Sequence, residues 1–300
     1  MMTSLSGLYA ALATPYTHDD AIDTESLRSL LRFVQSQGLD GVYVGGSTGE
    51  SLLQTAQERE RVLRFVASEC REKARFIGHV GALSTKESKK LARVCSDEGY
   101  AAVSAIPPVY YPQSKKNVHK YYSEIVDAAN GVPLIIYNIP AMSGVKFSTA
   151  DLSELLSIPN VIGVKQTSLD MHQMEQMHRL FPEKLLLNGY DESFLAGIVS
   201  GAHGGIGSTF NIMGGRYKRI WDLANDGNVK EALSVQSQCN TVIDVLVEAG
   251  VFPGIKFILH RMGIIASARC REPFGEVDPV HHNALGRIAD ALMEESGVKR

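Results

Sequence analysis

A short β-rich segment followed by a longer amphipathic segment recurs eight times along this chain of 300 residues. Several of the β-rich segments are continuous apolar runs, a pattern typical of parallel strands that are covered on both faces. Eight such alternations predict a (β/α)8 TIM barrel. A doubly wound sheet is the main alternative, because local patterns do not reveal whether a sheet closes. The expected strands begin at Leu8, Gly41, Arg75, Ala101, Pro133, Val161, Lys184 and His203.

The amphipathic segments carry signals of helix ends. Thr24 is the expected N-cap of the first helix and Gly38 is its C′ glycine, while the S-x-x-E spelling from Ser84 to Glu87 predicts a capping box. Beyond Gly227 the chain continues with helical segments, which predict a C-terminal helical extension. We interpret the chain as a single domain of residues 1–300, in which 7–225 form the barrel and 226–300 form a helical appendage.

Composition narrows the classes of function. The formal net charge is −3, without a basic patch or an acidic tail, so we expect neither nucleic acid nor a membrane surface as a partner. No apolar stretch reaches the roughly 18 residues needed to span a bilayer, and the N-terminal segment lacks the basic region of a signal peptide. The four cysteines form neither a zinc pattern nor a C-x-x-C pair, which favours reduced thiols in a cytoplasmic protein.

One lysine follows directly on an apolar strand. In VIGVKQT, four strand residues lead into Lys165. A lysine with its ordinary pKa of about 10 is an ammonium at neutral pH, and burial disfavours that charged form. A neutral amine at this position can attack a ketone and form a Schiff base. The alternative is a structural lysine whose amine reaches solvent at the strand end.

A tyrosine ends the strand before it. Tyr137 closes LIIY, and neighbouring parallel strands lie about 4.8 Å apart. The phenol of Tyr137 and the amine of Lys165 are therefore predicted to share a pocket at the carboxyl end of the barrel, where barrel enzymes hold their active sites. A phenol there can carry a proton to and from the substrate. The alternative is a core tyrosine whose hydroxyl is satisfied by the protein.

Three other predicted strand ends carry polar or glycine-rich turns. In GGSTGE, Ser47 and Thr48 precede a helix and are candidates for holding a carboxylate, although the spelling is not that of a P-loop. In NGYDE, Asp191 and Glu192 are candidates for binding sugar hydroxyls or for acid and base work, and N-capping by Asp191 is the alternative. No histidine lies at ligand spacing from them, so we expect no metal site. GGIGST is interpreted as a loop that lets backbone approach a ligand.

Several motifs together resemble a known family. GLYAALATPY, DGVYVGGSTGE, AVSAIPPVYYP, YNIPAMSGVK, GVKQTS, NGYDE, GGIGSTFNIMG and GVFPGIK occur in the order and at the spacing of the pyruvate-dependent class I aldolases. This is the dihydrodipicolinate synthase and N-acetylneuraminate lyase family, and the resemblance runs from about Gly7 to about Val277. The resemblance is greater to the lyase branch. It implies reversible aldol cleavage of N-acetylneuraminate to N-acetylmannosamine and pyruvate, without a cofactor, by a homotetramer.

The resemblance also implies roles for single residues. Lys165 would form the Schiff base, and Tyr137 would transfer protons together with Ser47 and with Tyr110 of a neighbouring subunit. Ser47 and Thr48 would hold the carboxylate of the keto acid. The sugar part would be held by Thr167, Gly189, Asp191, Glu192 and Ser208.

One position argues against the synthase branch of the family, and another departs from the lyase pattern. The synthase branch carries an arginine two residues past the proline of the YNxP turn, where this chain has Met142, so no cation meets a second carboxylate. Leu169 stands where the lyase pattern has glycine, which leaves the shape of that turn open. The alternatives are a related aldolase or dehydratase acting on another keto acid, a barrel that only binds such ligands, and a metal-dependent aldolase.

Overall fold

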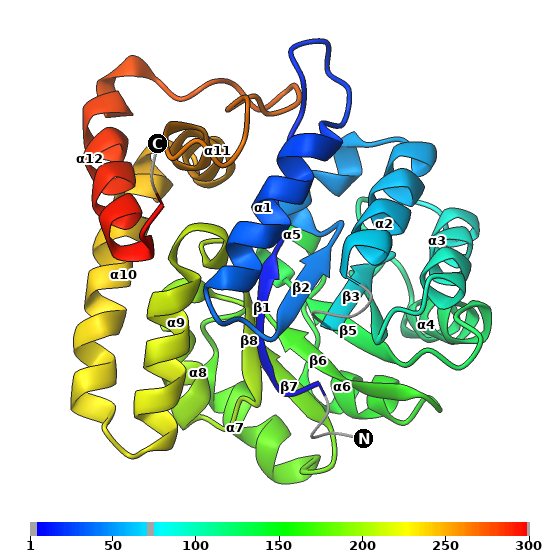
Figure 1. Cartoon of the computed structure of the whole chain (residues 1–300). Coiled ribbons are helices and arrows are strands. Elements are labelled where there is room, and N and C mark those ends of the chain that lie inside the picture. Colours follow the sequence, from blue (N-terminus) through cyan, green and yellow to red (C-terminus); the bar gives the residue numbers. More distant parts are fainter. Residues whose placement is uncertain (1–4, 71–74, 299–300) are drawn as a thin grey trace.

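The strands of the computed structural model form a closed parallel barrel, with each strand paired to its neighbours in chain order and β8 paired with β1 (Figure 1). The structure describes residues 5–70 and 75–298. The predicted (β/α)8 barrel is confirmed, and the doubly wound alternative is wrong, because β1 and β8 pair in parallel from Gly7 to Ala10. The strands are β1 (Gly7–Ala11), β2 (Gly41–Val44), β3 (Arg75–His79), β4 (Ala102–Ala105), β5 (Leu134–Asn138), β6 (Val161–Gln166), β7 (Leu185–Asn188) and β8 (Gly204–Gly207).

Helices surround the barrel and follow each strand (Figure 1). The helices of the barrel are α1 (Thr24–Ser36), α2 (Ala56–Cys70), α3 (Thr85–Asp97), α4 (Lys115–Ala128), α5 (Pro140–Ser143), α6 (Thr149–Leu156), α7 (Met171–Leu180), α8 (Phe194–Val199) and α9 (Phe210–Asn225). Three helices follow them, α10 (Val229–Ala249), α11 (Val251–Arg261) and α12 (Pro279–Ser296). Short 3-10 turns are η2 (Ser47–Gly49), η3 (Ser51–Leu53) and η4 (Asp191–Ser193).

The ends of the first helices test the expected caps. The prediction of Thr24 as N-cap is wrong, because the carboxylate of Asp23 accepts the free N–H groups of the first turn and Thr24 is already helical. Gly38 has a φ of +77°, as a C′ glycine requires. Ser84 is the N-cap of α3, and its hydroxyl accepts from the backbone N–H of Glu87.

Two separate apolar cores follow from the alternation of side chains along the strands. One core lies between the barrel and its helices. The other fills the inside of the barrel, and its members include Tyr9, Ala11, Tyr43, Ile77, Ala102, Ile135, Tyr137, Leu185, Leu187 and Ile206. Gly163 belongs to the inward series of β6, where a Cβ would lie 2.0 Å from the carbonyl oxygen of Leu185. Only glycine therefore lets β6 run this close to β7, two positions before Lys165.

The C-terminal helices pack against one side of the barrel. α10 lies alongside α9, while α11 and α12 pack on each other at the end of the molecule where the strands finish (Figure 1). Among the helices within residues 5–70 and 75–298, none combines the length and the apolar character that crossing a membrane requires.

Candidate active site

Strand register places the predicted amine beside the predicted phenol. Lys165 of β6 pairs with Tyr137 of β5, and both side chains point into the barrel. Lys165 is 4% exposed, and its Nζ lies 3.9 Å from the ring centroid of Tyr137 and 4.6 Å from that of Tyr43. Within the described residues the amine has no carboxylate partner. The amine therefore sits between two aromatic faces at the carboxyl end of the barrel.

Tyr43 and His79 complete this niche, and neither was singled out in the sequence. The Tyr43 hydroxyl donates to Ser104 Oγ at 3.1 Å, and burial raises the pKa of Tyr43 well above its usual value. The His79 ring meets the Tyr137 ring edge to face, with their centroids 5.9 Å apart. Both residues stand at strand positions whose side chains point into the barrel. The alternation of inward and outward positions along a strand could therefore have identified them in the sequence.

The imidazole of His79 joins two turns of the site. Its Nδ1 lies 2.8 Å from the carbonyl oxygen of Gly45, and its Nε2 accepts from the backbone N–H of Ile106 at 3.3 Å. This pairing assigns the hydrogen to Nδ1 and makes the ring neutral. Burial, with the nearby charges of Arg59 and Lys165, lowers the pKa of His79 to about 3. His79 therefore serves as a fixed link between the turns after β2 and β4.

The turn after β2 holds the two hydroxyls expected to meet a carboxylate. Ser47 and Thr48 open η2, and the first N–H groups of a helical turn have no acceptor within it. The Thr48 hydroxyl lies 2.7 Å from that of Ser208, which follows β8. Thr48 is buried, whereas Ser47 and Ser208 are half-buried. Three predicted residues from distant parts of the chain are thus brought to one side of the barrel mouth.

Asp191 is buried and bonded to the turn after β8. Its Oδ2 accepts from both the backbone N–H and the hydroxyl of Thr209, each at 2.7 Å. Burial raises the pKa of Asp191 to about 6, against the lowering effect of these hydrogen bonds. N-capping by Asp191 is wrong, because η4 starts at Asp191 itself and its N-cap, Tyr190, makes no side-chain cap. Glu192 beside it is exposed.

Thr167 and Gly189 face each other across the ends of β6 and β7. The Thr167 hydroxyl is buried and has no partner among the described residues. A Cβ on Gly189 would lie 1.9 Å from that hydroxyl, so only glycine fits opposite it. Among the described residues, the Thr167 hydroxyl is thus a buried group that is free to bind a ligand.

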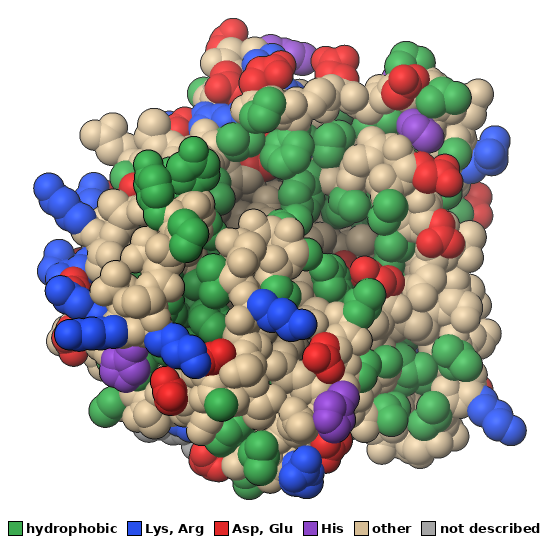
Figure 2. Space-filling model, turned by 180° about the vertical axis from the view of Figure 1, so that it is seen from behind, with side chains coloured by type: hydrophobic (Ala, Val, Ile, Leu, Met, Phe, Trp, Pro, Cys, Tyr) green, Lys and Arg blue, Asp and Glu red, His purple; other side chains and the backbone are tan. Residues whose placement is uncertain are grey.

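The remaining predicted position, Tyr110, is exposed to solvent in the single chain. Tyr110 is 84% exposed, has a φ of +74° and packs edge to face on Tyr111. Met142 and Leu169 are also exposed, at 63% and 68%. Seen from behind, the molecule shows hydrophobic side chains gathered around hollows of its surface (Figure 2).

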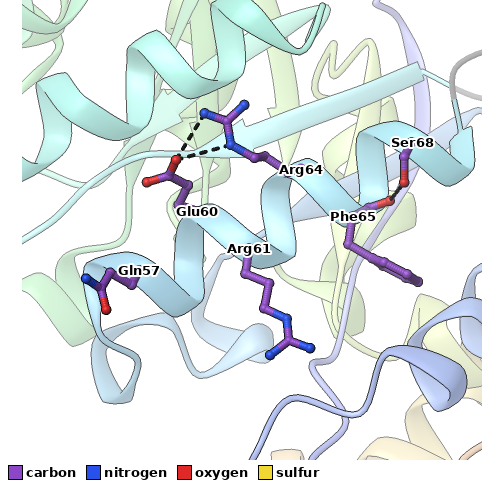
Figure 3. A pocket seen from close by; sticks show the side chains of 6 residues that line it. All are labelled: Gln57, Glu60, Arg61, Arg64, Phe65 and Ser68. Atoms are coloured by element: carbon purple, nitrogen blue, oxygen red, sulfur yellow. Dashed lines mark hydrogen bonds and ion pairs between the residues drawn. The ribbon is translucent and has the colours of Figure 1, made fainter.

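A surface hollow lies on the outer face of α2. Its volume is about 550 Å³, and it is lined by Gln57, Glu60, Arg61, Arg64, Phe65 and Ser68 (Figure 3). Arg64 donates to Glu60 at 3.0 Å, and the Arg64 side chain is 44% exposed. Ion pairs in this setting contribute little. We interpret this hollow as a solvated helix face.

Metal-ligating side chains do not gather in the part of the chain that the structure describes. No group of three His, Cys, Asp or Glu side chains there lies close enough to hold a metal ion. The groups that meet at the barrel mouth are one amine, several hydroxyls and one buried carboxyl. A buried amine of this kind can form a Schiff base with a keto substrate, and closed parallel barrels hold their active sites at this end.

Comparison with known proteins identifies the family. The chain belongs to the dihydrodipicolinate synthetase family, whose model matches residues 4–292. It is 48% identical to the N-acetylneuraminate lyase of Salmonella typhimurium over 295 residues, which are 98% of this chain and 99% of that protein. The family expected from the motifs is therefore confirmed.

Solved structures agree with that assignment. A catalytic lysine mutant of the Ruminococcus gnavus sialic acid aldolase matches with a TM-score of 0.93 and 30% identity, over 99% of this chain and 98% of that one. The N-acetylneuraminate lyase of Fusobacterium nucleatum complexed with pyruvate matches with a TM-score of 0.89 and 34% identity, over 98% and 97%.

Proposed function

We propose that this chain cleaves N-acetylneuraminate reversibly to N-acetylmannosamine and pyruvate through a Schiff base on Lys165. The observation that carries the proposal is the buried Lys165 amine, 3.9 Å from the Tyr137 ring centroid and without a carboxylate partner among the described residues. The full-length similarity to an N-acetylneuraminate lyase supports this substrate. The enzyme is accordingly a carbon–carbon lyase.

The Schiff base explains how the bond breaks. The Lys165 amine attacks the ketone of the open-chain sugar acid, and loss of water gives an iminium. The iminium draws electrons from the neighbouring carbon–carbon bond, which breaks to leave an enamine on the lysine and an aldehyde on the sugar. Protonation of the enamine and addition of water release pyruvate and restore the amine. The lysine is itself the electron sink, so the proposed reaction needs no added cofactor.

Tyr137 moves the proton. Cleavage requires a base for the hydroxyl that becomes the aldehyde. The Tyr137 phenol gives its proton to the hydroxyl that leaves as water when the iminium forms, and the resulting phenolate accepts the proton of the sugar hydroxyl and returns it to the enamine carbon. The neighbouring Tyr43 ring limits the orientations of both groups, since its centroid lies 6.0 Å from that of Tyr137.

The two ends of the substrate are assigned to two groups of residues, which meet where the Thr48 hydroxyl lies 2.7 Å from that of Ser208. The carboxylate of the keto acid lies at the hydroxyls and backbone N–H groups of Ser47 and Thr48. The sugar hydroxyls lie along the turns after β6, β7 and β8, at Thr167, Gly189, Asp191, Glu192 and Ser208. A neutral polyhydroxylated aldehyde needs no cation at its far end, which agrees with Met142 in place of the arginine of the synthase branch.

A neighbouring copy completes the proposed site. Tyr110 is exposed in the single chain, so we assign it to the pocket of an adjacent subunit in a homotetramer, where it joins Tyr137 and Ser47 in proton transfer. A cytoplasmic location stays a prediction from the sequence.

The test is pyruvate release from N-acetylneuraminate by the purified protein, with Lys165→Ala beside it. We expect release by the wild type and none by the variant. Lys120→Ala, which removes an amine from a side chain that is 74% exposed, is the matched control and should keep full activity. Borohydride with pyruvate should add a stable adduct to the wild type and to Lys120→Ala but not to Lys165→Ala. Normal turnover by Lys165→Ala would exclude the Schiff base, and an adduct without turnover would point to another keto acid.

A further inference from the structure

The residue that follows the Ser47–Gly49 turn has an uncommon backbone conformation. Glu50 has a φ of +56° and a ψ of +34°, in the left-handed region that residues with a side chain rarely adopt. Its N–H donates to the carbonyl oxygen of Ser47 at 2.9 Å, so this conformation closes the turn. Such strain persists only where surrounding contacts fix it.

The Glu50 carboxylate is held by residues of the C-terminal region. It forms an ion pair with Lys256 of α11, and the two side chains are 0% and 1% exposed. Its Oε2 also accepts from the backbone N–H of Arg271 at 2.8 Å. Lys256 Nζ donates to the carbonyl oxygen of Arg269 at 2.9 Å and lies 4.2 Å from the Tyr16 ring centroid. Both charges are thus fixed on several sides.

The rest of the same turn is fastened from two directions. The Arg271 guanidinium donates to the carbonyl oxygen of Leu53 at 3.1 Å and pairs with Glu58. The side-chain amide of Gln54 donates to the carbonyl oxygen of Gly49 at 2.7 Å. Side chains therefore hold three successive parts of the segment that begins with the proposed carboxylate-binding residues.

A buried ion pair contributes little net stability compared with apolar residues of the same size, because both charges lose their hydration. An apolar contact would therefore attach α11 to the barrel at least as well. The Glu50–Lys256 pair adds a defined geometry that an apolar contact lacks. A buried carboxylate has low energy only where it meets both its charged partner and its N–H donor. This geometry fixes the end of the Ser47–Gly49 turn.

We infer that Lys256 and Glu50 are positioning residues, through which the C-terminal helices hold the Ser47–Gly49 turn in the geometry that binds the keto-acid carboxylate. This inference rests on the proposed function, because it concerns the affinity of the same turn for pyruvate. Both side chains are almost fully buried, so we assign them an effect on the turn and not a contact with the substrate. Their loss acts on pyruvate affinity and leaves the Lys165 amine in place.

The experiment measures the pyruvate concentration that gives half of the maximal borohydride-trapped adduct, read by intact mass. Lys256→Met keeps an unbranched side chain that is one atom shorter and leaves the buried Glu50 charge unpaired, so we expect that concentration to rise about tenfold or more, with the maximal adduct unchanged. Glu50→Gln with Lys256→Met removes both charges, while the glutamine oxygen still accepts from Arg271. The double variant should recover most of the affinity.

A control variant separates positioning from general loosening. Arg216→Met breaks the Arg216–Glu295 pair between α9 and α12, which also attaches the C-terminal helices but lies away from the turn. It should leave the half-maximal concentration unchanged. If Lys256→Met does not fold, Glu50→Gln alone, which keeps the hydrogen bond from Arg271 but turns an NH2 group toward Lys256, should give about a threefold rise or more. Unchanged affinity in a folded variant, or an equal shift in Arg216→Met, would overturn the inference, whereas no adduct in the wild type would overturn the proposed function instead.

Discussion

The two sides of the barrel mouth are built by different means. On one side, Tyr137 and Lys165 face each other because β5 and β6 pair in that register, so backbone hydrogen bonds between neighbouring strands set the distance. On the other side, the Ser47–Gly49 turn lies beyond its strand and is fixed by the side chains of Glu50, Lys256 and Arg271. The reactive pair thus depends on the sheet, and the proposed anion-binding turn depends on contacts distant in sequence.

This difference teaches where each kind of substitution acts. A change on the register side alters one chemical group while the sheet holds its neighbours in place. A change on the other side removes a support and shifts backbone that binds the substrate. The first should affect the rate of the chemical step, and the second should affect affinity and stability.

The largest expected effect lies on the register side. Tyr137→Phe keeps the ring that packs on Lys165 and removes only the phenol oxygen, so kcat should fall about 10²- to 10⁴-fold with little change in stability. Borohydride should still trap pyruvate on this variant at the pyruvate concentrations that suffice for the wild type, because the amine is unchanged. Steady-state cleavage of N-acetylneuraminate measures the first effect, and intact mass measures the second. A kcat within a factor of two of the wild type would remove Tyr137 from proton transfer.

A smaller effect should appear on the side that is fastened by charges. Lys256→Met should lower the free energy of unfolding by about 3–5 kcal/mol, because it leaves the carboxylate of Glu50 buried and unpaired. Removing both charges should cost less than this single change. Denaturant unfolding of the two single variants and the double variant gives the coupling directly. If the losses of stability in the two single variants added up to the loss in the double variant, the Glu50–Lys256 pair would not determine the geometry of the turn.

The smallest effect concerns pH and Asp191. Its pKa of about 6 in the folded protein lies above the ordinary value of 3.8, so the folded state binds this proton more tightly than the unfolded chain does. The resulting stability is fully present below about pH 4 and is lost as pH rises through about 6, a difference of about 3 kcal/mol. Asp191→Asn should remove that dependence.

Unfolding between pH 4 and pH 7 measures the effect of Asp191. Asp222→Asn, at a carboxylate whose side chain is 51% exposed, is the control and should follow the wild type throughout. If the stability of Asp191→Asn changed with pH as steeply as that of the wild type, the pH dependence would belong to another group.

The sequence predicts the register side well and the other side poorly. Apolar runs and their order are local signals, so the eight strands can be inferred from the sequence, as can a pocket shared by Tyr137 and Lys165, whereas their direct pairing comes from the structure. The role of Glu50 cannot, because its partners lie 206 and 221 positions away, by the differences 256 − 50 and 271 − 50, and nothing local marks them. The N-cap of α1 differs from the prediction for a smaller reason, since Asp23 and Thr24 are adjacent and either type can cap.

The side chains that point into the barrel from alternate strand positions also indicate site residues. Tyr43 and His79 occupy positions that alternate with outward apolar residues, yet polar side chains within a strand look like ordinary core members until closure brings them around one axis. Their contacts with Tyr137 run across the inside of the barrel. Distances of that kind depend on the closed sheet and are not encoded by spacing along one strand.

The separation of Glu50 from Arg271 also bears on how the chain is made. Ribosomal synthesis delivers residues in order, so a growing chain holds Tyr137 and Lys165 long before the residues that fasten the Ser47 turn have emerged. A fragment ending ahead of Arg271 would carry the amine and the phenol but lack one attachment of the turn. If the proposed role of the turn holds, we expect prematurely terminated products to bind keto acids poorly.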